Sequence, residues 1–273
     1  MVSEYALAET PEEAGRLVAA DPDAIVMAGG TTVMPRAMLG ELSGRRVIGL
    51  ARAGLDTVSQ NGATTIGATT PLHTVAGLDG APLLAAAAQS IGSWALRTTA
   101  TAGGNLLVGS PYGDLVPPLL ALDAEITVAG ADGTRRLTLA DALAADSLLE
   151  PGELLTEIVV PAAEGATDFQ RCARRAAGAP SIVTVAARIR RDGEAIAEAR
   201  LAIGAVGPRA MRIAEAEDAL VGSAGGEEAI AAAVAAASSA VEPADDSIAS
   251  AWYRARMVDL HVRRALQTAA GAA

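Results

Sequence analysis

The chain has 273 residues, which allows one or two domains and a sizeable buried core. Hydrophobic residues make up 51% of it but aromatic residues only 2%, so we expect a core of alanine, valine, leucine and isoleucine. The formal net charge of −11 argues against nucleic-acid and anionic-membrane partners, because binding to phosphates requires clustered cations.

The cysteine content and the N-terminal residues exclude further kinds of site and signal. A single cysteine, Cys172, excludes a disulfide framework within the chain and an iron–sulfur cluster held by four cysteines. Residues 1–10 carry neither the basic region nor the apolar core of a secretory signal. Apolar stretches are interrupted well before the ~18 residues that a membrane span needs. We therefore expect no membrane span and a cytoplasmic location.

The first half of the chain alternates helix and strand signals. Thr10 followed by Pro11 and two glutamates is a typical helix start, and it predicts a helix over 11–20. Asn61-Gly62, between two β-type runs, predicts a hairpin. The other elements expected here are strands over 25–28 and 45–50 and helices over 70–78 and 82–91.

The second half predicts a sheet followed by helices. Asp132-Gly133 predicts another hairpin, and the polar residues 161–168 predict a domain boundary. The remaining elements expected are helices over 114–122 and 138–145, strands over 154–160, 181–190 and 198–205, helices over 213–221, 227–241 and 246–267, and a frayed tail over 268–273. Together these elements predict an α+β fold.

Two glycine-containing segments indicate a ligand-binding site. In the first, the apolar run 25–27 ends at Gly29-Gly30, followed by Thr31 and Thr32. A strand that ends in a glycine turn with free N–H groups forms a nest for phosphate oxygens. The segment lacks the third glycine of a GxGxxG motif, and it is no P-loop because the chain contains no lysine.

The second segment reads TATAGGN and leads to an acidic residue. Gly103 and Gly104 remove two successive Cβ atoms, so backbone N–H groups can approach a bulky ligand. Asn105 can donate and accept, and Asp114 can hold a pair of sugar hydroxyls. One long ligand with a central diphosphate would engage both segments. The alternatives are a plain surface turn, and Asp114 as the N-cap of a helix over 115–122.

These motifs resemble the FAD-binding subunit of molybdenum hydroxylases, the relatives of xanthine dehydrogenase and aerobic carbon monoxide dehydrogenase. The resemblance rests on AGGTTVMP at 28–35, TAGGN at 101–105, SPYGD at 110–114 and PPLLALDAEI at 117–126. It continues in the same order through ELLTEIVVP at 153–161, FQRCARRAAGAPSIVTVAARI at 169–189, ARLAIGAVGPRAMRIAEAEDALVG at 199–222 and YRARMVDLHVRRAL at 253–266.

The resemblance implies a two-part FAD-binding domain of the vanillyl-alcohol-oxidase type over 1–165, with parts at about 1–55 and 56–165, and a C-terminal sheet-and-helix domain over 166–273. Arg171 stands where many relatives carry a lysine near the flavin; the alternative is a solvated arginine in a basic run. The cofactor-binding residues expected from the resemblance are Val26, Met27, Ala28, Gly29, Gly30, Thr31, Thr32, Val33, Ile91, Thr101, Ala102, Gly103, Gly104, Asn105, Asp114, Leu155 and Arg171.

The implied function is electron transfer within a hetero-oligomeric oxidoreductase. FAD on this chain would take electrons from a small [2Fe–2S] subunit and pass them to an external acceptor. A large molybdopterin subunit would oxidise the organic substrate, so no catalytic residue and no metal ligand is expected here. The alternatives are a self-contained flavin oxidoreductase, such as the UDP-N-acetylmuramate reductase type, and a scaffold that has lost FAD.

Overall fold

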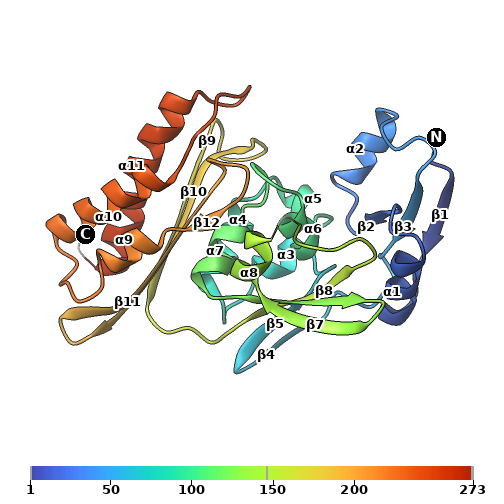
Figure 1. The fold of residues 1–273 in the computed structure, drawn as a ribbon, viewed down its shortest axis with the longest axis horizontal. Coiled ribbons are helices and arrows are strands. Elements are labelled where there is room, and N and C mark those ends of the chain that lie inside the picture. The colour runs from blue at the N-terminus through green and yellow to red at the C-terminus, as the bar shows by residue number, and fades with distance from the viewer. Residues whose placement is uncertain (1, 146, 272–273) are drawn as a thin grey trace.

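The computed structural model describes residues 2–145 and 147–271. Three sheets with their helices follow one another along the chain, from the N-terminal group on the right of Figure 1 to the C-terminal group on the left. This mixture of helices with parallel and antiparallel sheets confirms the α+β class.

The N-terminal group is a small parallel sheet in the order β1-β3-β2. Helix α1 (Pro11–Ala20) packs Ala14 and Val18 against it, and Thr10 caps the helix by accepting from the Glu13 N–H, as the sequence predicts. Its other elements are β1 (Glu4–Leu7), β2 (Ile25–Met27), β3 (Arg46–Gly49) and α2 (Val33–Met38). Helix α2 buries no residue and extends away from the sheet (Figure 1).

The middle group is an antiparallel sheet in the order β4-β5-β8-β6-β7. Both predicted hairpins are confirmed, as β4–β5 and β6–β7. The strands are β4 (Val58–Asn61), β5 (Ala63–Gly67), β6 (Glu125–Gly130), β7 (Gly133–Thr138) and β8 (Leu154–Val160). The helices are α3 (Leu72–Val75), α4 (Pro82–Ser90), α5 (Trp94–Arg97), α6 (Ala102–Leu107), α7 (Val116–Ala121) and α8 (Leu139–Ala144). These strands and helices together supply most of the largest apolar core.

The C-terminal group is an antiparallel sheet in the order β12-β11-β10-β9, with three helices. The strands are β9 (Ala166–Ala173), β10 (Ser181–Asp192), β11 (Ala195–Gly204) and β12 (Met211–Arg212), and the helices are α9 (Ala214–Asp218), α10 (Glu227–Ala240) and α11 (Ala251–Ala270). Valines of β10 pack with α10 and α11 in a second core, while α7 of the middle group contacts β10 and β11.

Two sequence expectations about the ends of the last helix are wrong. The last helix begins at Ala251 and not at 246, because the Asp246 carboxylate accepts from the N–H groups of Ile248 and Ala249 and holds a turn there. The same helix continues to Ala270, so residues 268–270 are not frayed, and 272–273 lie outside the described residues. Strand β9, which the sequence did not predict, begins at Ala166.

Asp123 connects the middle group to the C-terminal sheet. Its carboxylate pairs with Arg188 at 2.7 Å, with Arg212 at 2.8 Å and with Arg200 at 3.1 Å. Glu198 adds a second carboxylate at 2.7 Å from Arg188. These ion pairs fix the position of the sheet relative to α7, which immediately precedes Asp123. Within the described part of the chain, no helix is long and apolar enough to cross a membrane.

Candidate functional site

The first glycine segment leaves four consecutive N–H groups unused. Strand β2 ends at Met27, whose carbonyl accepts from Leu50, and the Gly30 carbonyl accepts from Met34 at the start of α2. Between them, the N–H groups of 29–32 donate to no other described residue. Gly30 has φ of +71°, a conformation that glycine adopts without strain. Consecutive unbonded N–H groups beside a residue in the left-handed region are features that anion-binding nests share.

The second glycine segment starts a helix, so the alternative of a plain surface turn is wrong. Gly103 and Gly104 lie in the first turn of α6, and the Thr101 hydroxyl caps it by accepting from the Gly104 N–H at 3.2 Å. The Ala102 and Gly103 N–H groups donate to the carbonyls of residues 70 and 68. Thr101 thus acts as an N-cap, which is the commonest role of threonine at a helix start.

The two glycines of α6 have different surroundings. A Cβ on Gly103 would lie 2.8 Å from the Ala68 carbonyl oxygen, so Gly103 permits close packing of α6 on the segment after β5. Gly104 is exposed, and a Cβ there would approach only the Thr101 hydroxyl. Gly103 is therefore required by the fold, whereas a side chain on the exposed Gly104 would meet only the hydroxyl that caps the helix.

The fold brings the two glycine segments together. A Cβ on Gly29 would lie 1.9 Å from the carbonyl oxygen of Thr99 and 2.8 Å from its carbonyl carbon. Thr99 precedes the α6 cap by two residues. One ligand can therefore reach both the unused N–H groups of the first segment and the exposed start of α6.

Asn105 does not present its amide to the surface. Its Oδ1 accepts from the Leu115 N–H at 3.0 Å, and its Nδ2 donates to the Tyr112 carbonyl at 3.0 Å. The side chain thus fixes the loop between α6 and α7, which carries Asp114. Its direct role in the structure is to position that carboxylate.

Asp114 is buried and faces the C-terminal domain. Its Oδ2 accepts from Ser181 Oγ at 2.9 Å and from Arg171 Nε at 3.1 Å. Burial raises the pKa of Asp114, while the bonds from Ser181 and Arg171 act in the opposite direction. The capping alternative is wrong, because α7 has no side-chain cap. The solvated alternative for Arg171 is also wrong, since only 9% of its side chain is exposed.

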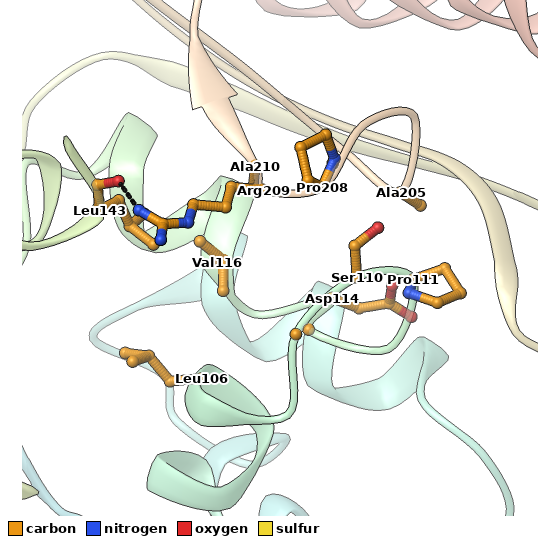
Figure 2. A pocket seen from close by; sticks show the side chains of 13 residues that line it. Leu106, Ser110, Pro111, Asp114, Val116, Leu143, Ala205, Pro208, Arg209 and Ala210 are labelled. Atoms are coloured by element: carbon orange, nitrogen blue, oxygen red, sulfur yellow. Dashed lines mark hydrogen bonds between the residues drawn. The ribbon is translucent and has the colours of Figure 1, made fainter. Parts of the chain in front are cut away.

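A small cavity lies beside Asp114. Figure 2 shows it between the loop with Ser110 and Pro111 and the loop with Ala205 and Pro208 of the C-terminal domain. Its volume of about 60 Å³ is far below the several hundred Å³ of a pocket that encloses a drug-sized ligand. A dinucleotide therefore cannot lie inside it, although Asp114 can meet a ligand group at its edge.

The remaining predicted residues range from buried core positions to exposed ones. Leu155 of β8 is 2% exposed and packs within the middle core. Ile91 is also buried, and its carbonyl accepts from Arg97 Nη1 at 3.0 Å. Val26 and Ala28 pack partly against the N-terminal core, and Thr31 and Thr32 are exposed.

Ser181 was missed by the sequence analysis. It lies 67 positions from Asp114 and carries no local motif. In a regular strand it would share a face with Val183 and Val185, which pack against the helices of the C-terminal domain. A register shift between positions 181 and 183 of β10 reverses that orientation and turns Ser181 toward Asp114.

Comparisons with known proteins identify the family. Residues 1–163 match the FAD binding domain in molybdopterin dehydrogenase, and 169–269 match the CO dehydrogenase flavoprotein C-terminal domain. The chain is 29% identical to the glyceraldehyde dehydrogenase medium chain of Sulfolobus acidocaldarius, over 97% of this chain and 98% of that one. It is 32% identical to the 6-hydroxypseudooxynicotine dehydrogenase complex subunit alpha of Paenarthrobacter nicotinovorans, over 97% and 94% of the two chains.

A solved structure agrees with these matches. A chain of carbon monoxide dehydrogenase from Hydrogenophaga pseudoflava, in a form lacking the Mo-pyranopterin moiety, superposes with a TM-score of 0.92 at 30% identity, covering 98% of this chain and 97% of that one. The resemblance read from the motifs is confirmed. This chain belongs to the FAD-binding subunits of the molybdenum hydroxylases, a family of multi-subunit dehydrogenases that includes carbon monoxide and xanthine dehydrogenases.

Proposed function

We propose that this subunit uses FAD to take electrons from a [2Fe–2S] partner and deliver them to an external acceptor. The observation that carries the proposal is the nest of unused N–H groups at 29–32 beside Thr99, next to the exposed start of α6. Such a nest favours a diphosphate. Bound FAD supplies the ability to accept and release electrons singly or in pairs.

The residues of this chain bind and orient the cofactor. We infer that the N–H groups from Gly29 to Val33 receive the diphosphate and that the α6 start around Thr101 and Gly104 lies along the ribityl side. Asp114 offers Oδ1 to a ligand hydroxyl, because that oxygen accepts from no other described residue. Ile91 and Leu155 support the surrounding segments through the core, and Asn105 holds the loop of Asp114.

The chain needs partners to complete the reaction. It has one cysteine, and the described residues contain no group of three or more His, Cys, Asp or Glu able to hold a metal ion. Its relatives are named as medium chains and as a subunit of a dehydrogenase complex. We infer a small [2Fe–2S] subunit and a large molybdopterin subunit. We place the division between the FAD-binding and C-terminal domains near 161–168, between the two family matches.

An anaerobic experiment tests the proposal. The full chain, loaded with FAD, is mixed first with candidate organic substrates and then with the two partner subunits, while flavin bleaching is followed. We expect no bleaching until the partners are present. Bleaching by an organic substrate without partners would show that this chain oxidises substrate itself. Failure of the chain to take up FAD would favour the scaffold alternative.

A further inference from the structure

We propose that Ser181 is a positioning residue for the FAD site, holding Asp114 so that one carboxylate oxygen alone is offered to the cofactor. The inference rests on the proposed function, because it assumes that Asp114 Oδ1 meets a ligand hydroxyl. It assigns a part of the cofactor site to the C-terminal domain, which contains neither glycine segment.

The hydrogen bonds around Ser181 form a closed triangle. Ser181 Oγ donates to Asp114 Oδ2 at 2.9 Å and accepts from Arg171 Nε at 2.8 Å, while the same Nε also donates to Asp114 Oδ2 at 3.1 Å. A hydroxyl has a single proton, so its direction is set when one neighbour is a donor and the other a carboxylate. Both donors converge on Oδ2, which leaves Oδ1 without a partner among the described residues.

The triangle is anchored on both sides. Ser181 is fully buried, and Arg171 also donates through Nη2 to the carbonyl of Ala179. The register shift in β10 turns Ser181 toward the middle group and away from the face of the sheet that packs on the helices. Bulges commonly re-aim one side chain near a functional site. Ile182 is the residue left without a partner in β9, whereas Ser181 still pairs with Ala173 while its hydroxyl reaches Asp114.

The bonds from Ser181 and Arg171 also favour the ionised form of Asp114, which is the better acceptor for a ligand hydroxyl. Burial on its own disfavours the ionised form of Asp114, and the Ser181 and Arg171 bonds oppose that effect. A carboxylate accepts a ligand hydroxyl more strongly than a neutral acid does, because charge-assisted hydrogen bonds are the stronger kind. Loss of Ser181 should therefore weaken FAD binding chiefly through Asp114.

A double-mutant cycle on the full chain tests this coupling. FAD is titrated into FAD-free wild type, Ser181→Ala, Asp114→Asn and the double variant, with affinity measured by flavin fluorescence. We expect Ser181→Ala to raise Kd about tenfold, the scale of ~1.4 kcal/mol. In the Asp114→Asn background the same change should alter Kd less than about twofold. An unchanged Kd for Ser181→Ala, or an equal change in both backgrounds, would overturn the proposal.

Two further variants separate positioning from folding. Ser223→Ala removes hydrogen bonds to Leu220 and Gly225 elsewhere in the C-terminal domain and should leave the Kd for FAD unchanged. Arg171→Lys keeps the charge but loses the Nε that reaches both partners, and its effect should likewise vanish in the Asp114→Asn background. An equal loss of affinity in Ser223→Ala would assign the Ser181 effect to general destabilisation. If wild type itself binds no FAD, the proposed function fails as well.

Discussion

The backbone of Gly29 lies directly against the carbonyl group of Thr99, at a distance that leaves no room for a Cβ. This contact joins the N-terminal parallel sheet to the segment that starts α6. It explains why a glycine is needed in the first segment independently of any ligand. It also sets the distance between the two places where we expect the cofactor to bind.

Gly29→Ala should therefore separate the two segments. The new Cβ would stand 1.9 Å from a backbone oxygen, which cannot move aside like a flexible side chain. We expect a loss of about 1–3 kcal/mol in unfolding free energy, the usual cost of overpacking, and a weaker affinity for FAD. Gly15→Ala is the control, because a Cβ there would meet nothing within 4 Å apart from the backbone of its own helix. Equal FAD affinity in Gly29→Ala and wild type would contradict the shared site.

The adjacent glycines of α6 should respond differently to substitution. Gly103→Ala meets the Ala68 backbone at 2.8 Å and should impair folding. Gly104→Val should lower FAD occupancy more than stability, because the exposed position borders only the Thr101 hydroxyl. We expect a stability loss of about 1 kcal/mol at most, the worth of a helix cap. Purified variants can be compared by flavin absorbance and urea midpoint. Full FAD content in Gly104→Val would remove this helix start from the site.

Asp123 offers a test of the junction between the middle and C-terminal groups. It has φ of +51°, which asparagine tolerates, so Asp123→Asn changes the charge with little change in backbone preference. Arg188, Arg200 and Arg212 would each lose a carboxylate, although Glu198 still pairs with the first two. Since Asp123 is partly exposed, we expect a loss of about 1–3 kcal/mol in unfolding free energy. The exposed Asp56→Asn is the control, and an equal urea midpoint for both variants would contradict this role.

The sequence predicts local features of this fold better than contacts between distant segments. The Thr10 cap and the Asn61-Gly62 hairpin occur as predicted because neighbouring residues determine them. The helix at Gly103-Gly104 was not predicted, because it depends on the Thr101 cap and on packing against the distant Ala68. Ser181 could not have been found, because alternation along β10 would place it on the opposite face and the register shift depends on pairing with β9.

Asp114 should make both the stability of the protein and its affinity for FAD depend on pH. Burial raises its pKa above 3.8, so the folded protein binds this proton more tightly than the unfolded chain does. The group's contribution to stability is then fully present below 3.8 and is lost as pH rises through the folded pKa. FAD binding should show the opposite trend: affinity should fall as acid protonates the carboxylate, by an amount approaching the ~1–3 kcal/mol of a charge-assisted hydrogen bond.

Asp114→Asn isolates this effect. The variant should bind FAD weakly at neutral pH. Its FAD affinity should also lack the fall toward acidic pH that protonation of Asp114 causes in the wild type. His261 titrates in both proteins and so cancels in the comparison. Burial lowers the pKa of His261 and raises that of Cys172, so the thiol stays protonated over this pH range. The measurement is FAD affinity by fluorescence from neutral to acidic pH, with the melting temperature of the FAD-free proteins recorded alongside. Parallel affinity profiles for wild type and Asp114→Asn would show that the carboxylate does not contact the cofactor, and Oδ1 would need another partner.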